Sequence, residues 1–195
     1  MQKLRLGVLG SGKGSNFGAI AKATEAGQLN AETRIVISDV ESAGILDLAR
    51  QHGIRAEFVS PGKFRTKLDP EAEQRVVELL KEADVDLVVL AGYMRMVKEP
   101  LLEAFPQRII NIHPSLLPNY PGLAAWKQAV EAGATVTGCT VHYVDSGMDT
   151  GPVIAQREVP VHPGDTPETL HARIQFAEHE LYPAVIAKLA AERKV

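Results

Sequence analysis

Apolar residues occur along the first half of the chain in short, nearly continuous runs. Leu4–Leu9, Ile35–Ser38 and Asp86–Leu90 have the length and the branched side chains of strands that are covered on both faces. Phe58-Val59 is a weaker example of the same pattern. Helix-like stretches separate these runs, and one begins at Asp69-Pro70, an N-cap followed by proline at the first helical position. Strands that alternate with helices predict parallel strands with right-handed crossovers, and therefore an open, twisted α/β sheet.

The second half of the chain has a different pattern. Val136–Val144 and Val153–Val161 are long, alternate in polarity and are separated by a short loop rich in Asp and Gly, which predicts an antiparallel pair. Thr166-Pro167-Glu168 begins a terminal helix whose apolar positions recur every three or four residues, and Pro183 should kink or split that helix. We find no repeat or linker, so the prediction is a single domain over residues 1–195.

Composition narrows the class of protein. The chain has 195 residues, of which 45% are hydrophobic and 23% charged, close to the average of globular domains. A net charge of −3 gives no general reason to expect nucleic-acid binding. Cys139 is the only cysteine, and neither a signal peptide nor a membrane span is recognisable. These features predict a cytoplasmic protein.

Gly10, Gly12 and Gly14 follow the first predicted strand and precede a helix-like stretch. This context suits an anion, because glycines let the backbone approach a ligand and free N–H groups at a helix N-terminus face negative charge. The spacing of these glycines does not match the glycine motif of dinucleotide-binding proteins. Gly14 also occupies the position at which a P-loop has the hydroxyl residue that binds magnesium. The segment therefore favours a site for a single phosphate, with a tight turn that binds nothing as the alternative.

Asn111 and His113 lie two residues apart in an apolar segment that ends at Pro114. In a strand they would share one face, about 7 Å apart, with Ile110 and Ile112 on the other face. Proline cannot continue a central strand, so the polar pair should lie at the carboxyl end, the edge where open α/β sheets bind ligands. The pair is a candidate site, and a structural histidine is the alternative.

Asp149 is a candidate partner for this pair, although it could simply form a turn in its glycine-containing loop. A carboxylate beside His113 would favour the imidazolium form of the ring. Asn111 and protonated His113 could then donate hydrogen bonds to an oxygen that gains charge at a tetrahedral carbon.

The sequence offers no clear nucleophile or metal site. Neither Cys139 nor Ser115 lies in a recognisable elbow or beside an activating pair, and the histidines lack the spacing of metal ligands. The residues therefore indicate acyl transfer by positioning, proton transfer and oxyanion stabilisation, without covalent catalysis.

Several ordered motifs resemble one family. The motifs Asn111-Ile-His113-Pro-Ser-Leu-Leu-Pro118, Thr140-Val-His142 and Asp149-x-Gly151-Pro152 are similar to those of the folate-dependent formyltransferases. Ser11–Asn16, Ala91–Arg95 and Gln175–Pro183 resemble the branch of that family that acts on phosphoribosylglycinamide. The similarity runs from Leu6 to Pro183, nearly the whole chain.

This resemblance implies transfer of a formyl group from 10-formyltetrahydrofolate, the co-substrate, to the amine of 5'-phosphoribosylglycinamide, the third step of de novo purine synthesis. It also implies a Rossmann-like N-terminal sheet, with a phosphate-binding half over residues 1–100 and a catalytic and folate-binding half over residues 101–195. The expected partners are these small molecules, without nucleic acid, membrane or metal. The expected assembly is a monomer or a homodimer.

The resemblance also assigns residues by position. Asn111, His113 and Asp149 would be the catalytic group. The substrate-binding residues would be Gly14, Ser15 and Asn16 at the ribose phosphate and Glu178 at the glycinamide end. The folate-binding residues would be Lys67, Met94, Arg95, Met96, Val97 and Asn111.

Some of these residues have structural alternatives. Met94, Met96 and Val97 could be core residues, because methionine in an apolar segment usually packs in the interior. Lys67 could be an exposed cation, and Glu178 an ordinary surface residue.

Three further positions bear on the resemblance to this family. His142 lies on the same face of a predicted strand as its alternate neighbours, and we expect it to have a structural role or to support the catalytic residues. Ala124 stands where the family commonly has His or Asn, with Trp126 just beyond it. A polar side chain near the substrate is therefore missing.

Three other functions compete with this interpretation. A 10-formyltetrahydrofolate hydrolase would share the catalytic group, but it is expected to have an additional N-terminal regulatory domain before the first strand. Formylation of another amine, such as methionyl-tRNA or an amino sugar, is a second alternative. A non-catalytic nucleotide-binding module is a third, and only the glycine-rich segment supports it.

Overall fold

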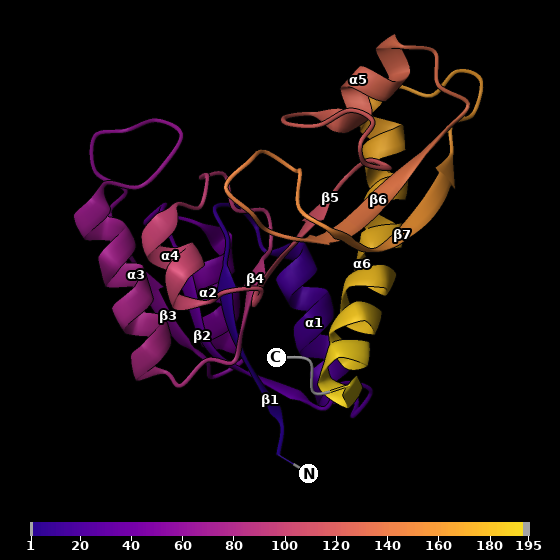
Figure 1. Cartoon of the computed structure of the whole chain (residues 1–195). Helices are drawn as coiled ribbons and strands as arrows, with labels where there is room; N and C mark the ends of the chain where they lie inside the picture. Colours follow the sequence, from indigo (N-terminus) through magenta and orange to yellow (C-terminus); the bar gives the residue numbers. More distant parts are fainter. Residues whose placement is uncertain (1, 193–195) are drawn as a thin grey trace.

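The computed structural model describes residues 2–192, and the strands in this part of the chain form a seven-stranded sheet (Figure 1). In chain order they are β1 (Leu4–Leu9), β2 (Ala31–Ser38), β3 (Arg55–Phe58), β4 (Leu87–Leu90), β5 (Ile109–His113), β6 (Val136–Tyr143) and β7 (Val153–Pro160). Their order in space is β3-β2-β1-β4-β5-β6-β7. The chain therefore crosses the sheet after β3, and β1 and β4 lie side by side.

The two halves of the sheet differ in direction as the sequence predicts. Strands β1 to β5 pair in parallel, whereas β6 is antiparallel to both β5 and β7. The α/β open sheet with a parallel N-terminal half and antiparallel C-terminal strands is thus confirmed. One boundary differs: β3 covers Arg55–Phe58 and not Phe58-Val59. It is an edge strand with half-exposed and exposed residues, so its pairing needs no apolar run.

Helices cover both faces of the sheet. They are α1 (Ser15–Glu25), α2 (Gly44–Gln51), α3 (Pro70–Glu82), α4 (Glu99–Ala104), α5 (Ala125–Glu131) and α6 (Pro167–Glu192). Buried residues of α1, α2, α5 and α6 share one apolar cluster with the sheet, and those of α3 and α4 share the other. Among residues 2–192, none of these helices has both the length and the apolar character needed to cross a membrane.

Helix α6 passes beside α1 and continues through Pro183 as one helix of 26 residues, so it is not split there (Figure 1). Proline removes one helical hydrogen bond, but Tyr182, Val185 and Ile186 on both sides of the proline are buried. The hydroxyl of Tyr182 reaches the carbonyl oxygens of Leu90 and Ile110 at 2.9 and 3.1 Å. This contact connects α6 to the two strands that lead into the polar edge of the sheet.

Candidate active site

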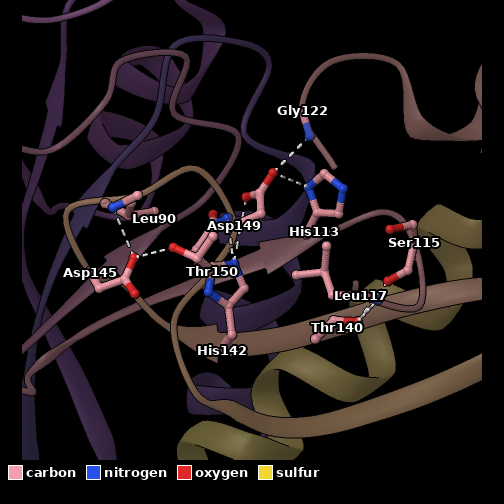
Figure 2. Close-up of polar contacts among 12 residues, drawn as sticks. Leu90, His113, Ser115, Leu117, Gly122, Thr140, His142, Asp145, Asp149 and Thr150 are labelled. Carbon is pink, nitrogen blue, oxygen red and sulfur yellow. Dashed lines mark hydrogen bonds and ion pairs between the residues drawn. The ribbon is translucent and has the colours of Figure 1, made fainter. Parts of the chain in front are cut away.

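The polar residues singled out by the sequence gather at the carboxyl ends of β1, β4 and β5. The glycine-rich loop follows β1, the segment 91–97 follows β4, and Asn111 and His113 lie at the end of β5. The loop 145–152 between β6 and β7 reaches the same edge (Figure 2). The strand order brings these loops together, because β4 lies between β1 and β5.

Strand β5 separates polar from apolar side chains as its alternation predicts. Ile110 and Ile112 belong to the apolar cluster that contains α1 and α6. Asn111 and His113 therefore point to the opposite face, and His113 is only 4% exposed. Both of these residues pair with β6, where Asn111 lies opposite His142.

The ring of His113 is held between two oxygen acceptors. Its Nδ1 lies 3.3 Å from Oδ2 of Asp149, and its Nε2 lies 2.9 Å from the carbonyl oxygen of Tyr120 (Figure 2 shows the carboxylate contact). Only the doubly protonated ring offers a donor to both acceptors. An acceptor at each ring nitrogen therefore fixes the orientation of the His113 ring.

Asp149 occupies a backbone conformation that few side chains tolerate. Its φ is 55°, in the left-handed region that Asp and Asn enter more readily than other residues with side chains. Its Oδ2 accepts a hydrogen bond of 2.9 Å from the amide of Gly122 (Figure 2). Within the same loop, Oδ1 of Asp145 accepts bonds from the Gly147 amide at 3.0 Å and the Thr150 hydroxyl at 2.7 Å. The loop thus fixes the carboxylate beside His113.

His142 orients the carboxamide of Asn111. Its Nδ1 donates to the carbonyl oxygen of Tyr143 at 2.9 Å, and burial lowers the pKa of the ring below 6.5. A neutral ring with a proton on Nδ1 has an acceptor at Nε2, and Nδ2 of Asn111 donates to it at 3.3 Å. Nε2 also lies 3.7 Å from Oδ1 of Asp149. The expected supporting role of His142 therefore has a geometric basis, which the sequence did not supply.

Thr140 secures the loop that follows β5. Its hydroxyl donates to the carbonyl oxygen of Ser115 at 2.7 Å and accepts from the amide of Leu117 at 3.0 Å (Figure 2). Gln156 on β7 donates to the same hydroxyl and to the carbonyl oxygen of Leu117. Ser115 has a structural role, because its hydroxyl donates to the carbonyl oxygen of Asn119.

The glycine-rich loop has the backbone of an anion site. Gly14 precedes α1 with φ +82°, and a side chain there would meet Ile45 at 2.7 Å. A side chain on Gly10 would lie 2.7 Å from the carbonyl oxygen of Ala91. Within the described residues no side chain caps α1, so the amides of its first turn remain available to a ligand. Ser15, the first helical residue, is exposed.

Asn16 and Glu178 contact each other across α1 and α6. Nδ2 of Asn16 donates to Oε2 of Glu178 at 3.2 Å, and Glu178 is 5% exposed. Burial raises the pKa of this carboxyl to about 7, and the bond from Asn16 lowers it only in part. Oδ1 of Asn16 is also buried and has no hydrogen-bond partner among residues 2–192. The alternative of Glu178 as an ordinary surface residue is therefore wrong.

The five predicted folate-binding residues outside β5 have different environments. Met94 is 59% exposed and Met96 is half-buried, so neither is a core residue, whereas Val97 is packed in the cluster with α3 and α4. Lys67 forms an isolated bridge with Met96, and its Nζ lies 4.6 Å from the centre of the Phe64 ring. Nε of Arg95 is bonded to Asp39 at 2.7 Å, which limits what its guanidinium can offer a ligand.

The region of Ala124 and Trp126 contains an aromatic contact. Ala124 precedes α5 with φ 52°, and Trp126 stacks on His171 of α6 with 3.7 Å between ring centres and 8° between planes. Burial lowers the pKa of His171 below 6.5. The indole therefore connects α5 to α6.

Neither Cys139 nor a cluster of metal-ligating side chains forms a second site in the described part of the chain. Burial raises the pKa of the Cys139 thiol to about 12, so the thiol remains protonated and a poor nucleophile. Between residues 2 and 192, no group of three or more His, Cys, Asp or Glu side chains could hold a metal ion.

Sequence reasoning missed the backbone groups of the site and one carboxylate. Tyr120 and Gly122 contribute a carbonyl oxygen and an amide to His113 and Asp149, and no residue-type pattern signals such contacts. Asp39 was also missed. Its position directly after β2, at the same sheet edge, was the available signal.

Comparisons with known proteins place this geometry in a family. The family model described as formyl transferase matches residues 4–186. Phosphoribosylglycinamide formyltransferase of Bacillus subtilis is 42% identical over 185 residues, which cover 95% of this chain and 94% of the relative. The human trifunctional purine biosynthetic protein adenosine-3 is 39% identical over 97% of this chain, which spans 19% of that relative.

Solved structures agree with the sequence comparison. The crystal structure of glycinamide ribonucleotide transformylase 1 from Symbiobacterium toebii has a TM-score of 0.93 and 46% sequence identity, and the match covers 100% of this chain and 91% of that one. The fold, the family model and the full-length bacterial relative coincide over nearly the whole chain. The chain therefore belongs to the formyl transferase family.

Proposed function

We propose that the chain transfers the formyl group of 10-formyltetrahydrofolate to the amine of 5'-phosphoribosylglycinamide, a step of purine biosynthesis. The observation that carries this proposal is the joint geometry of Asn111, His113 and Asp149. An oriented carboxamide and a ring held by a carboxylate lie at the carboxyl end of β5, at the same sheet edge as the glycine-rich loop. The Bacillus subtilis relative has this activity in its name.

Gly14, Ser15 and Asn16 bind the ribose phosphate in this proposal. The free amides at the start of α1 supply N–H donors and the positive end of the helix dipole. Lys13 is exposed in the same loop and adds a positive charge. The incomplete nucleotide motifs agree with this role, because one phosphate needs neither a second glycine turn nor a magnesium ligand.

Glu178 faces the glycinamide end of the substrate. Its carboxyl is buried and has one hydrogen bond, from Asn16, which leaves acceptor capacity for an amine or amide N–H. Asn16 contacts Glu178 and lies in the first turn of α1, so it joins the phosphate end of the substrate site to the glycinamide end.

The segment after β4 suits the folate co-substrate, which supplies an activated formyl carbon. Met94 is exposed on this segment, and Met148 is 54% exposed on the loop that contains Asp149. Exposed, polarisable side chains on two loops beside His113 match a flat aromatic ring system. Lys67 would meet the folate carboxylates, and Arg95, Met96 and Val97 would shape the segment that receives the ring.

The chemistry follows from charge development. The substrate amine attacks the formyl carbon, a carbon–nitrogen bond forms, and the formyl oxygen gains negative charge. Asn111 stabilises that oxygen by donating from Nδ2, and His113, kept protonated by Asp149, stabilises it through its positive charge, because both ring nitrogens already face acceptors. As the bond to the folate nitrogen breaks, a bound water takes the proton that the amine loses and delivers one to that nitrogen. The atoms and charges then balance without a covalent enzyme intermediate.

The proposal also covers the roles of the two halves of the chain, the location of the protein and its assembly. In this proposal residues 1–100 contribute the phosphate loop and residues 101–195 the catalytic group. Each substrate draws on both halves, because Glu178 binds the ribonucleotide and Met94 binds the folate. We propose that the protein acts in the cytoplasm on small molecules, as a monomer or a homodimer.

The test is spectroscopic. Purified protein is mixed with 10-formyl-5,8-dideazafolate and glycinamide ribonucleotide, and deformylation of the donor is followed. Turnover that needs the ribonucleotide supports the proposal. Equal turnover without the amine would instead indicate a hydrolase, and turnover only with a different amine another formyltransferase. Binding without any turnover would indicate a nucleotide-binding module.

A further inference from the structure

We propose that Asp39 is a positioning residue that sets the shape of both ligand-binding segments at once. This inference rests on the proposed function, because it assigns the phosphate loop and the segment after β4 to the two substrates. Asp39 follows β2 at the carboxyl edge of the sheet, and its side chain is only 3% exposed. None of the catalytic steps above uses it.

The two carboxylate oxygens of Asp39 have different partners. Oδ1 accepts a hydrogen bond of 2.5 Å from the hydroxyl of Ser11, in the glycine-rich loop. Oδ2 accepts a bond of 2.7 Å from Nε of Arg95, in the segment after β4. One buried carboxylate thus connects two loops that are far apart in the sequence.

Each partner extends the connection. The hydroxyl of Ser11 also accepts a bond of 2.9 Å from the amide of Met94, so the two loops contact each other directly. Nη1 of Arg95 donates to the carbonyl oxygens of Phe64 and Arg65, at 2.9 and 2.6 Å. The loop before α3, which contains Lys67, is therefore held by the same guanidinium.

The pairing of the Arg95 guanidinium with the Asp39 carboxylate explains why the contact between the two loops depends on Asp39. The Arg95 side chain is 16% exposed and lies against a carboxylate that is more deeply buried. Removing the carboxylate leaves a partly buried guanidinium without its charged partner and a hydroxyl without its acceptor, so both loops can relax. Asn111, His113 and Asp149 lie on other elements, so the chemical step itself should change little.

Asp39→Ala is the decisive variant. We expect the KM for the ribonucleotide and the KM for the folate donor each to rise by at least ~10-fold, with kcat within about 3-fold of the unchanged protein. Asp39→Asn removes the charge but retains an oxygen that can accept from Arg95, so each KM should lie between that of Asp39→Ala and that of the unchanged protein. Glu41→Ala removes an exposed carboxylate two residues away and should change neither KM.

Hydrogen exchange provides a readout that needs no substrate. In Asp39→Ala the amides of residues 10–14 and 91–97 should both exchange faster, because the bond between Ser11 and Met94 loses its support. A lower melting temperature with both KM values unchanged would overturn the proposal. So would a rise in only one KM, or faster exchange in only one segment. Absence of formyl transfer by the unchanged protein would overturn the proposed function, and the exchange measurement would still decide the role of Asp39.

Discussion

Nδ1 of His113 lies 3.3 Å from Oδ2 of Asp149, although the two residues come from different parts of the chain and from different elements. The strand β5 supplies one and the loop between β6 and β7 supplies the other. Because Nε2 of the same ring faces the carbonyl oxygen of Tyr120, the carboxylate is the only charged group in contact with the ring among the described interactions. Asp149 thus places a negative charge directly against the His113 ring.

Asp149→Asn should lower kcat by at least ~10²-fold while the protein folds normally. The amide oxygen can still accept the bond from Gly122, so the substitution removes the charge and retains the loop contact. Steady-state kinetics with the folate donor measure the effect. Asp145→Asn is the matched control, since its oxygen can still accept from Gly147 and Thr150, and we expect less than a ~3-fold change. Equal losses in both variants would show that loop order, and not the charge beside His113, limits the reaction.

The contact between His142 and Asn111 leads to a second prediction. His142→Ala frees the Asn111 carboxamide to rotate, so kcat should fall by about 10-fold with little change in either KM. His142→Gln offers an amide oxygen as acceptor and should recover most of the activity. Asn111→Ala removes the donor itself and should cost at least ~10²-fold in kcat. The interpretation fails if His142→Ala is as active as the unchanged protein, or if His142→Gln is no better than His142→Ala.

Glu178 should make stability depend on pH. Its folded-state pKa of about 7 lies above the value of 4.5 expected without burial, so the folded protein binds the proton more tightly than the unfolded chain. The stabilisation is fully present below about pH 4.5 and is lost as pH rises through about 7. Relative to the unchanged protein, Glu178→Gln should therefore gain on the order of 3 kcal/mol in unfolding free energy above that range. Urea titrations between pH 5 and 8 measure this difference, and a difference independent of pH would contradict it.

Trp126 provides an intrinsic probe, because it is the only tryptophan of the chain. A protonated imidazole stacked on an indole quenches its fluorescence, and burial lowers the pKa of His171 below 6.5. Emission should fall reversibly as pH decreases, with a midpoint below 6.5. His171→Gln should abolish the transition, whereas His162→Gln, an exposed histidine elsewhere, should leave it intact. A transition that survives His171→Gln would exclude the stack as its source.

Local patterns were sufficient for much of the fold. Leu4–Leu9 is β1 as predicted. The periodic spacing of apolar and polar residues also predicted three other features: the common face of Asn111 and His113, the antiparallel pair β6 and β7, and the terminal helix. The edge strand β3 was misplaced, because an edge strand lacks the apolar run that identifies a central one. Helix α6 was not split at Pro183, because burial on both sides of the proline outweighs one lost hydrogen bond.

The contacts that complete the site depend on the tertiary fold. No sequence pattern indicates that Nδ2 of Asn111 faces His142, or that Asp39 joins Ser11 to Arg95, since each contact depends on strand order and loop path. The assignment of Glu178 to the substrate came from the resemblance alone, and only the fold explains its burial against Asn16. The pairing of His113 with Asp149 could therefore be predicted from the sequence, whereas the partners of Asn111 and Glu178 could not.

The Tyr182 hydroxyl, on the last helix, contacts the carbonyl oxygens of Leu90 and Ile110, so the core can be completed only late in the synthesis of the protein. A nascent chain that has left the ribosome only as far as β7 lacks the helix that covers Phe17 and Ile20 on α1. One face of its sheet is then only partly covered, by α1, α2 and α5, and the carbonyl oxygens of Leu90 and Ile110 lack a buried donor. Completion of the core must wait for translation of the last helix. A prematurely terminated chain would present that apolar face to chaperones and proteases.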